Sequence, residues 1–230
     1  MPAPYPLITM LNPSTNSYAS SNMAAAHNAF IQGINAIVQH APTVPKEKVQ
    51  AFMIFGLAVV DNIHHHHDLE EQYLFPEYEK KLGHGAMSQN VQEHKQFVPA
   101  LLELKEHMED IKSGNSLYDS NLLLSKIHSF SDVMIAHLTH EVSLLESGRM
   151  RANFTEKDLK DIDSGFMSLA LKRIEFATTM PLSVVCGNPE TPWFPPFPLP
   201  LKWATRWWFA RKYSEAWEFG PLDLYGNPRK

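Results

Sequence analysis

Residues 63–76 read IHHHHDLEEQYLFP and place a histidine, His66, four residues before a glutamate, Glu70. The same spacing returns later in the chain at His137 and Glu141. Residues four apart lie on one face of an α-helix, about one turn from each other. An imidazole and a carboxylate placed in this way can bind one metal ion together. Two such helices that face each other predict a metal centre inside a helical bundle.

The composition is that of a globular protein and limits the classes of function. The chain has 230 residues, of which 44% are hydrophobic and 20% are charged, enough for one domain with appendages. A net charge of −5 gives no electrostatic case for a nucleic-acid partner. The single cysteine, Cys186, excludes an intrachain disulfide framework. The N-terminus lacks the features of a secretory signal, and no apolar run is long enough to span a membrane, so we expect a cytoplasmic protein.

The hydrophobic pattern predicts an all-α protein, because apolar residues recur at helical spacing and no stretch alternates as a strand does. Pro76 and Pro99 lie inside the second and third expected helices, where each should kink or divide the helix. The connections are short, which predicts an up-down-up-down four-helix bundle over residues 18–148. Its helices are expected at about residues 18–40, 46–82, 87–112 and 118–147.

Three further segments flank the expected bundle. Residues 1–17 are rich in proline, serine and asparagine and should form an extended arm. Residues 149–180 should add a fifth helix, which begins at a capping box at Thr155. Residues 181–230 form a tail rich in proline and tryptophan, with a short helix at about 201–217. We expect this tail to pack on the bundle, although tryptophans beside basic residues also suit a membrane surface.

Each of the four expected helices offers at least one metal ligand. Imidazoles and carboxylates suit iron, manganese or zinc, and a glutamate can bridge two ions. Charged groups inside a bundle are unfavourable unless they are paired or bind metal. The recurrence on four helices therefore predicts a metal site with the candidate ligands His27, His66, Glu70, His94, His137 and Glu141. His67 and Glu71 have the same spacing as His66 and Glu70, so spacing alone leaves the register of the second helix open.

The pattern resembles the hemerythrin-like family, also called HHE cation-binding proteins. The resemblance covers about residues 18–148 and rests on histidines in the first and third helices, on both His-x-x-x-Glu pairs and on Phe75-Pro76. It implies a non-haem centre of two iron ions bridged by Glu70 and Glu141, with manganese or zinc less favoured. It also favours the register of Glu70, since the family's ligand is the first glutamate of the pair before Phe-Pro.

One departure from the family's oxygen carriers bears on function. Those proteins have His-x-x-x-His in the third helix, but here the positions four residues either side of His94 are Asn90 and Val98. We therefore expect a site that is one imidazole short and more open. Nearby groups such as Glu71, Glu93, His65 or Tyr73 can fill the gap or orient the ligands.

The resemblance implies a protein that binds iron and dioxygen or a related small ligand. Open positions at the metal equally suit a di-iron oxidase or oxygenase that acts on a small organic substrate. A set of four histidines and two carboxylates also resembles members implicated in iron sensing and in repair of iron centres. A structural bundle that holds zinc is a further, non-redox alternative.

Overall fold

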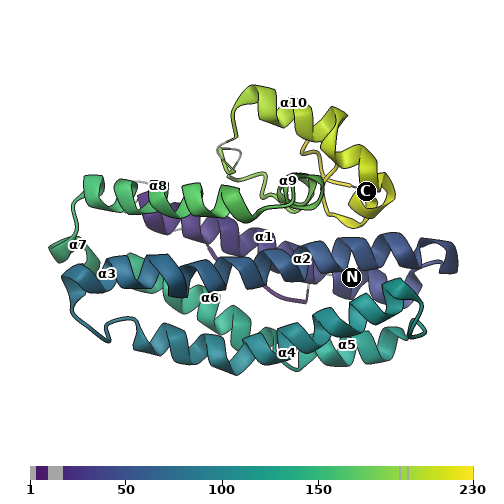
Figure 1. The fold of residues 1–230 in the computed structure, drawn as a ribbon, viewed down its shortest axis with the longest axis horizontal. Helices are drawn as coiled ribbons and strands as arrows, with labels where there is room; N and C mark the ends of the chain where they lie inside the picture. Colours follow the sequence, from purple (N-terminus) through teal and green to yellow (C-terminus); the bar gives the residue numbers. More distant parts are fainter. Residues whose placement is uncertain (1–3, 10–17, 192, 196, 230) are drawn as a thin grey trace.

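The computed structural model describes residues 4–9, 18–191, 193–195 and 197–229 (Figure 1). Within these residues the regular structure is helical, apart from one isolated bridge between Leu222 and Pro228. The all-α prediction is confirmed, and the first part of the chain forms the four-helix bundle. Its helices are α1 (Tyr18–His40), α2 (Val49–Leu69), α3 (Phe75–Leu82), α4 (Ser88–Ser113), α5 (Ser120–His128) and α6 (Ser131–Leu145). Two short 3-10 turns, Ala41–Thr43 and Lys46–Lys48, connect α1 to α2.

The second bundle helix passes through Pro76 without a break. The segment Glu70–Leu74 forms a π-helical turn between α2 and α3, and Pro76 follows in the first turn of α3. A proline lacks an N–H and its ring clashes with the carbonyl four residues earlier in a regular helix. The wider π turn and the first-turn position remove both conflicts. Pro99 likewise lies inside α4, which continues to Ser113.

The fourth bundle helix is divided, which the sequence pattern did not predict. Between α5 and α6, Phe130 has a φ of −129°, outside the helical range. The buried hydroxyl of Ser131 donates a 2.6 Å hydrogen bond to the carbonyl of Ile127. A serine that bonds to the carbonyl four residues earlier competes with the helical backbone bond and bends the helix.

The N-terminal arm is described over residues 4–9 and lies along α1. The Asn35 side chain accepts a 3.0 Å hydrogen bond from the backbone N–H of Tyr5 and donates a 2.8 Å hydrogen bond to its carbonyl. Asn28 does the same for Ile8, at 2.7 and 3.0 Å. The two asparagines are seven residues apart, so they lie on one helix face and hold the arm in an extended conformation. The remaining residues of the expected arm, 1–3 and 10–17, lie outside the described residues.

The interior of the bundle contains two apolar clusters, one towards each end. One contains Phe52, Phe55 and Phe97, and the other contains Leu69 and Phe75. Every bundle helix that carries a candidate ligand contributes to both clusters, on opposite sides of that ligand. The candidate ligands therefore occupy the boundary between two dry cores.

The C-terminal third of the chain packs against one side of the bundle, over α1 and α2 (Figure 1). The predicted fifth helix begins at its capping box but ends at Arg173, where Ile174 and Glu175 are extended. Pro181, expected to begin the tail, instead lies inside a further helix. The elements of this segment are α7 (Gly148–Asn153), α8 (Glu156–Arg173), α9 (Phe176–Val185), α10 (Leu199–Trp207) and the 3-10 segment Phe209–Phe219.

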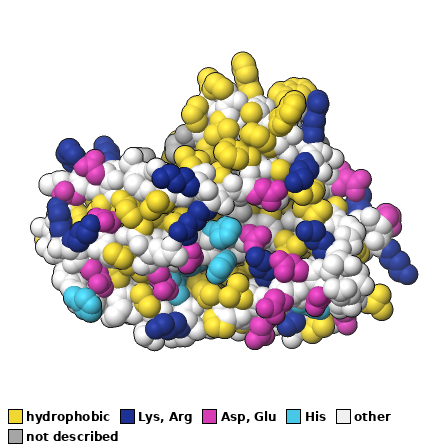
Figure 2. Space-filling view, in the orientation of Figure 1, with side chains coloured by type: hydrophobic (Ala, Val, Ile, Leu, Met, Phe, Trp, Pro, Cys, Tyr) yellow, Lys and Arg dark blue, Asp and Glu magenta, His cyan; other side chains and the backbone are white. Residues whose placement is uncertain are grey.

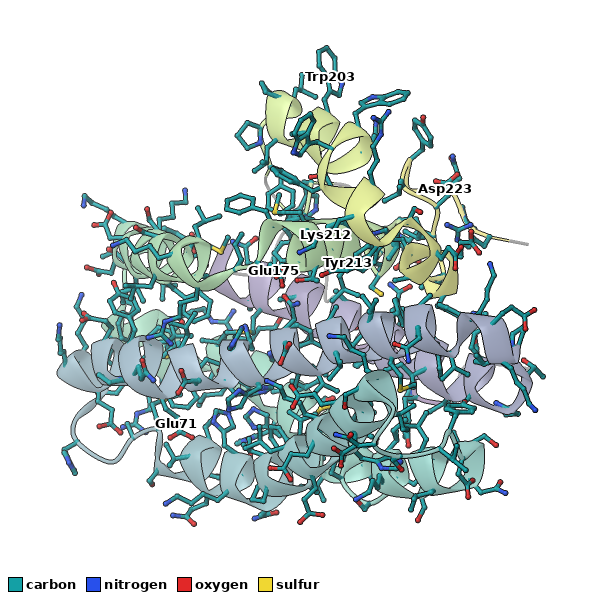
Figure 3. All side chains as sticks on the ribbon, turned by 45° about the vertical axis from the view of Figure 1, so that its right-hand side comes forward. Glu71, Glu175, Trp203, Lys212, Tyr213 and Asp223 are labelled. Atoms are coloured by element: carbon teal, nitrogen blue, oxygen red, sulfur yellow. The ribbon has the colours of Figure 1, made fainter. Side chains whose placement is uncertain are left out.

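The tail only partly follows the expectation that its aromatic residues cover the bundle. Trp217 is buried, and the ring of Phe219 lies 4.9 Å from that of Phe52. By contrast, Trp203, Trp207 and Trp208 are 64%, 59% and 76% exposed. Hydrophobic side chains project from this part of the surface, with Trp203 at its outermost point (Figures 2 and 3). Among the described residues, no helix is both long enough and apolar enough to cross a membrane.

The contact between Gly220 and the end of α9 gives a test of how the tail is held. A Cβ at Gly220 would lie 2.5 Å from Cβ of Val185, whereas a Cβ at Gly148 would meet no atom within 4 Å. Gly220→Ala should therefore lower the free energy of unfolding by about 1–3 kcal/mol, as overpacking does. Denaturant titration measures this, with Gly148→Ala as the matched control. Equal stability of the two variants would contradict the tight docking of the tail.

Candidate metal centre

The six ligands expected from the sequence converge at the boundary between the two apolar clusters. They come from α1, α2, the π-helical turn, α4 and α6, so each helix of the bundle core contributes. All are buried except His66, whose side chain is 10% exposed. The six are His27, His66, Glu70, His94, His137 and Glu141.

A seventh residue, His67, joins them. Its side chain is 1% exposed, and its Nε2 atom has no hydrogen-bond partner among the described residues. A helix turns about 100° per residue, so Glu70 projects about 40° to one side of His66 and about 60° to the other side of His67. Both imidazoles can therefore face the same carboxylate. Spacing alone left the two histidines as alternatives, whereas both lie in the cluster.

With Val98 in place of a further histidine on α4, His67 adds an imidazole to the group that contains His94. The centre thus contains five imidazoles, where four were expected. The signal was present in the run of four histidines, but spacing alone did not show that two of them turn inward. His65, considered as a replacement, is not among the clustered side chains, and the hydroxyl of Tyr73 lies beside Gly165 of α8.

The ligand atoms form two groups that share one carboxylate. In the first group, ligand atoms of His67, Glu70, His94 and His137 lie within 4.8 Å of one another. In the second, those of His27, His66 and Glu70 do so. The arrangement gives two adjacent positions for a cation, with Glu70 between them.

Both glutamates span the two groups. Glu70 Oε1 lies 2.7 Å from His66 Nε2, and Oε2 lies 3.5 Å from His94 Nε2. Glu141 Oε2 lies 3.5 Å from His27 Nε2 and 3.9 Å from His137 Nε2. Each carboxylate therefore has one neighbour in each group, as a bridging ligand requires.

The outer nitrogens of the imidazoles fix which way the inner nitrogens face. His94 Nδ1 lies 2.9 Å from Glu71 Oε1, and His137 Nδ1 lies 2.9 Å from Glu93 Oε2. Glu71 lies between its own helix and α4 (Figure 3). A carboxylate accepts a hydrogen bond from Nδ1–H, so in the neutral imidazole Nε2 carries a lone pair. The inner nitrogen of each ring, Nε2, can therefore bind a metal ion.

Backbone carbonyls play the same part for two other histidines. His27 Nδ1 lies 3.0 Å from the carbonyl oxygen of Leu138, and His67 Nδ1 lies 2.7 Å from that of Ile63. Both rings therefore also present a lone pair at Nε2 to the centre.

This hydrogen-bonding pattern fits a bound cation. The Nε2 atoms of His94 and His137 lie 3.0 Å apart, with neither carrying a proton in the arrangement above. All four oxygens of Glu70 and Glu141 are buried, and among the described residues none accepts a hydrogen bond of regular geometry, although Glu70 Oε1 lies 2.7 Å from His66 Nε2. Lone pairs that face one another across a dry interior are unfavourable unless a positive charge lies between them. The donor set thus accommodates metal ions.

Burial keeps the imidazoles neutral, which is the form that binds metal. Burial lowers the pKa of His66 and of His137 to about 4, and for His137 the neighbouring His94 adds to the effect. Burial also lowers the pKa of His27 and of His67 well below the ordinary value. It raises the pKa of Glu70, and a bound cation opposes that shift because positive charge favours the carboxylate.

The fold and this buried ligand set are those of a metal-binding helical bundle. The family model for the Hemerythrin HHE cation binding domain matches residues 19–146, more than half of the chain. The chain therefore belongs to the hemerythrin HHE cation-binding family.

A similar protein is the "Dimeric xanthone biosynthesis cluster protein R11" of Cryptosporiopsis sp. (strain 8999). It is 31% identical over 245 residues, which cover 99% of this chain and 90% of the relative. The similarity thus extends beyond the family domain into α8–α10 and the segments that join them. No solved structure gives a significant match.

The role of His67 can be tested by metal content. His67→Ala should lower the bound metal as strongly as His66→Ala, because each removes an imidazole from one of the two groups. His64→Ala is the matched control from the same histidine run and should leave the metal unchanged. Elemental analysis of the purified variants measures this. Full metal loading in His67→Ala would show that His67 is not a ligand.

The orienting role of Glu93 gives a second test. Glu93→Gln should weaken metal affinity by about 10–100-fold, because the neutral amide holds the His137 Nδ1 proton less firmly. Competition with a chelator measures the affinity. Glu103→Gln, at an exposed position of the same helix, should have no effect. Unchanged affinity in Glu93→Gln would show that Glu93 does not orient the ligand.

Proposed function

We propose that the centre holds two iron ions, binds dioxygen and oxidises an organic molecule, so that the protein is a non-haem di-iron oxidoreductase. The observation that carries this proposal is the pair of ligand groups that share Glu70, with inward Nε2 atoms and unpartnered carboxylate oxygens. Nitrogen and oxygen ligands of this kind suit iron, and manganese or zinc are less favoured alternatives. Bound iron would supply electron transfer to dioxygen.

The chain's own residues prepare the site for this chemistry. Glu71 and Glu93 hold the Nδ1 protons of His94 and His137, so these rings stay in one tautomer and one orientation. The apolar clusters on both sides keep water away and strengthen the electrostatic interactions inside. The phenyl rings of Phe30 and Phe166 flank His66, at 5.0 and 5.7 Å between ring centres.

Two observations support an enzyme over a carrier. A cavity of about 700 Å³ is lined in part by His66, far more room than dioxygen needs. The relative with similarity over nearly the whole chain is described as a protein of a biosynthesis cluster, which fits a role in making an organic compound. Reversible dioxygen binding is the second candidate function. The set of five imidazoles and two carboxylates favours it, because more protein ligands leave fewer open coordination positions at a metal ion.

The proposal is tested by metal analysis followed by exposure to dioxygen. Protein from iron-supplemented cells should contain about two iron ions per chain. After anaerobic reduction, dioxygen should change the optical spectrum irreversibly, whereas a carrier recovers its starting spectrum when the gas is removed. The Glu70→Gln/Glu141→Gln variant should bind little iron and show no such change. Zinc as the native metal, or no metal, would reject the proposal.

A further inference from the structure

The cavity beside the metal centre separates the bundle from the C-terminal segment. Its floor is formed by α1, α2 and α3, and its walls by α8, α9 and residues 194, 195, 197, 198 and 201. Its volume of about 700 Å³ lies within the range of about 300–1,000 Å³ that small-molecule sites occupy. Protein interiors contain few voids larger than a water molecule, so this space is a formed site.

The cavity reaches the candidate metal centre at His66. This imidazole lines it, as do Phe30 and Phe166 on either side of the ring. His66 is also the most exposed of the candidate ligands, at 10% of its side chain. A molecule in the cavity can therefore lie within one side chain's thickness of the cation positions.

The chemistry of the walls selects an aromatic guest. Three methionines line the space together with phenylalanines from three different parts of the chain. Methionine sulfur and phenyl rings both make favourable contacts with aromatic rings, and methionine adapts to irregular shapes. These residues are Met23, Met167, Met180, Phe30, Phe166, Phe194 and Phe197.

A smaller set of polar groups gives the guest a limited number of hydrogen bonds. Asn22 on α1 donates a 3.2 Å hydrogen bond to Asp163 on α8, and both side chains line the cavity. Asn62, Thr179 and Ser183 lie along other parts of the wall. Few polar groups in an apolar site fix the orientation of a ligand and favour one with a few hydroxyl or carbonyl groups.

We propose that this cavity is the substrate site and takes a polycyclic aromatic molecule that carries a few hydroxyl or carbonyl groups. The proposal rests on the proposed function for the identity of the reaction, but binding itself does not require the metal. The C-terminal segment is then part of the substrate site, because α8, α9 and residues 194, 195, 197, 198 and 201 supply its outer walls.

Filling the cavity from either side tests the proposal. Ala26 on α1 and Ala170 on α8 line it from opposite walls, and both are half-buried. Ala26→Phe and Ala170→Phe should each weaken binding of 1-hydroxyanthraquinone, a phenolic aromatic ketone, by about ten-fold or more, measured by calorimetry. Ala152→Phe, at an exposed position of α7, is the matched control and should bind as the parent does. The thermal unfolding curves and metal contents of all variants should match those of the parent.

The outcomes separate this proposal from the proposed function. Absence of binding by the parent, or binding that neither filling variant weakens, would overturn the substrate site even if iron is present. Tighter binding of decanoate than of the aromatic probe would overturn the aromatic class. Binding that both fillings weaken, in a protein that contains no iron, would support the cavity and reject the di-iron reaction. If one filled variant does not fold, the other, on the opposite wall, decides.

Discussion

The structure depends on one electrostatic constraint at the candidate metal centre. Two carboxylates and the Nε2 atoms of five imidazoles share a dry interior, and no lysine or arginine of the described residues pairs with these carboxylates. Glu70 and Glu141 are fully buried, and their oxygens accept no hydrogen bond of regular geometry among those residues. Groups of this kind are strongly unfavourable in an apolar interior unless positive charge compensates them. A metal ion supplies that charge in a small volume. The apolar clusters on either side exclude water that would otherwise solvate the candidate ligands.

Helical spacing was sufficient to predict the all-α fold and to select six of the seven side chains that the structure brings together, and their role as ligands stays a prediction. His27 and His94 were found from their positions on separate helices, and the structure places them with the two His-x-x-x-Glu pairs. His67 was not assigned, because a spacing rule forces a choice between neighbours whereas a carboxylate can lie between two of them. The π-helical turn was also not predictable, since Pro76 indicates a disturbance but not the form it takes. The cavity depends on how distant segments pack, which periodicity does not record.

The C-terminal segment has a larger role than a cover for apolar surface. Phe166 from α8 contacts His66, so the added helix takes part in the environment of the metal centre. The outer helix of this segment, α10, has one residue on the cavity and two tryptophans on the surface. Leu201 lines the cavity, whereas Trp203 and Trp207 are exposed to solvent. The sequence similarity to the Cryptosporiopsis cluster protein covers 99% of this chain, so it includes both the bundle and this segment. The substrate site that we propose exists only where both are present.

The distribution of ligands over the chain has a consequence for how the protein matures. The clustered side chains range from His27 to Glu141 and come from every long helix of the bundle. A nascent chain that ends before α6 lacks His137 and Glu141, so the complete ligand set forms only when α6 has joined the other helices. In the finished fold the cavity at His66 leaves one side of this set accessible. A cation would therefore reach a nearly complete fold from that side, with His66, the most exposed of the candidate ligands, as its first contact.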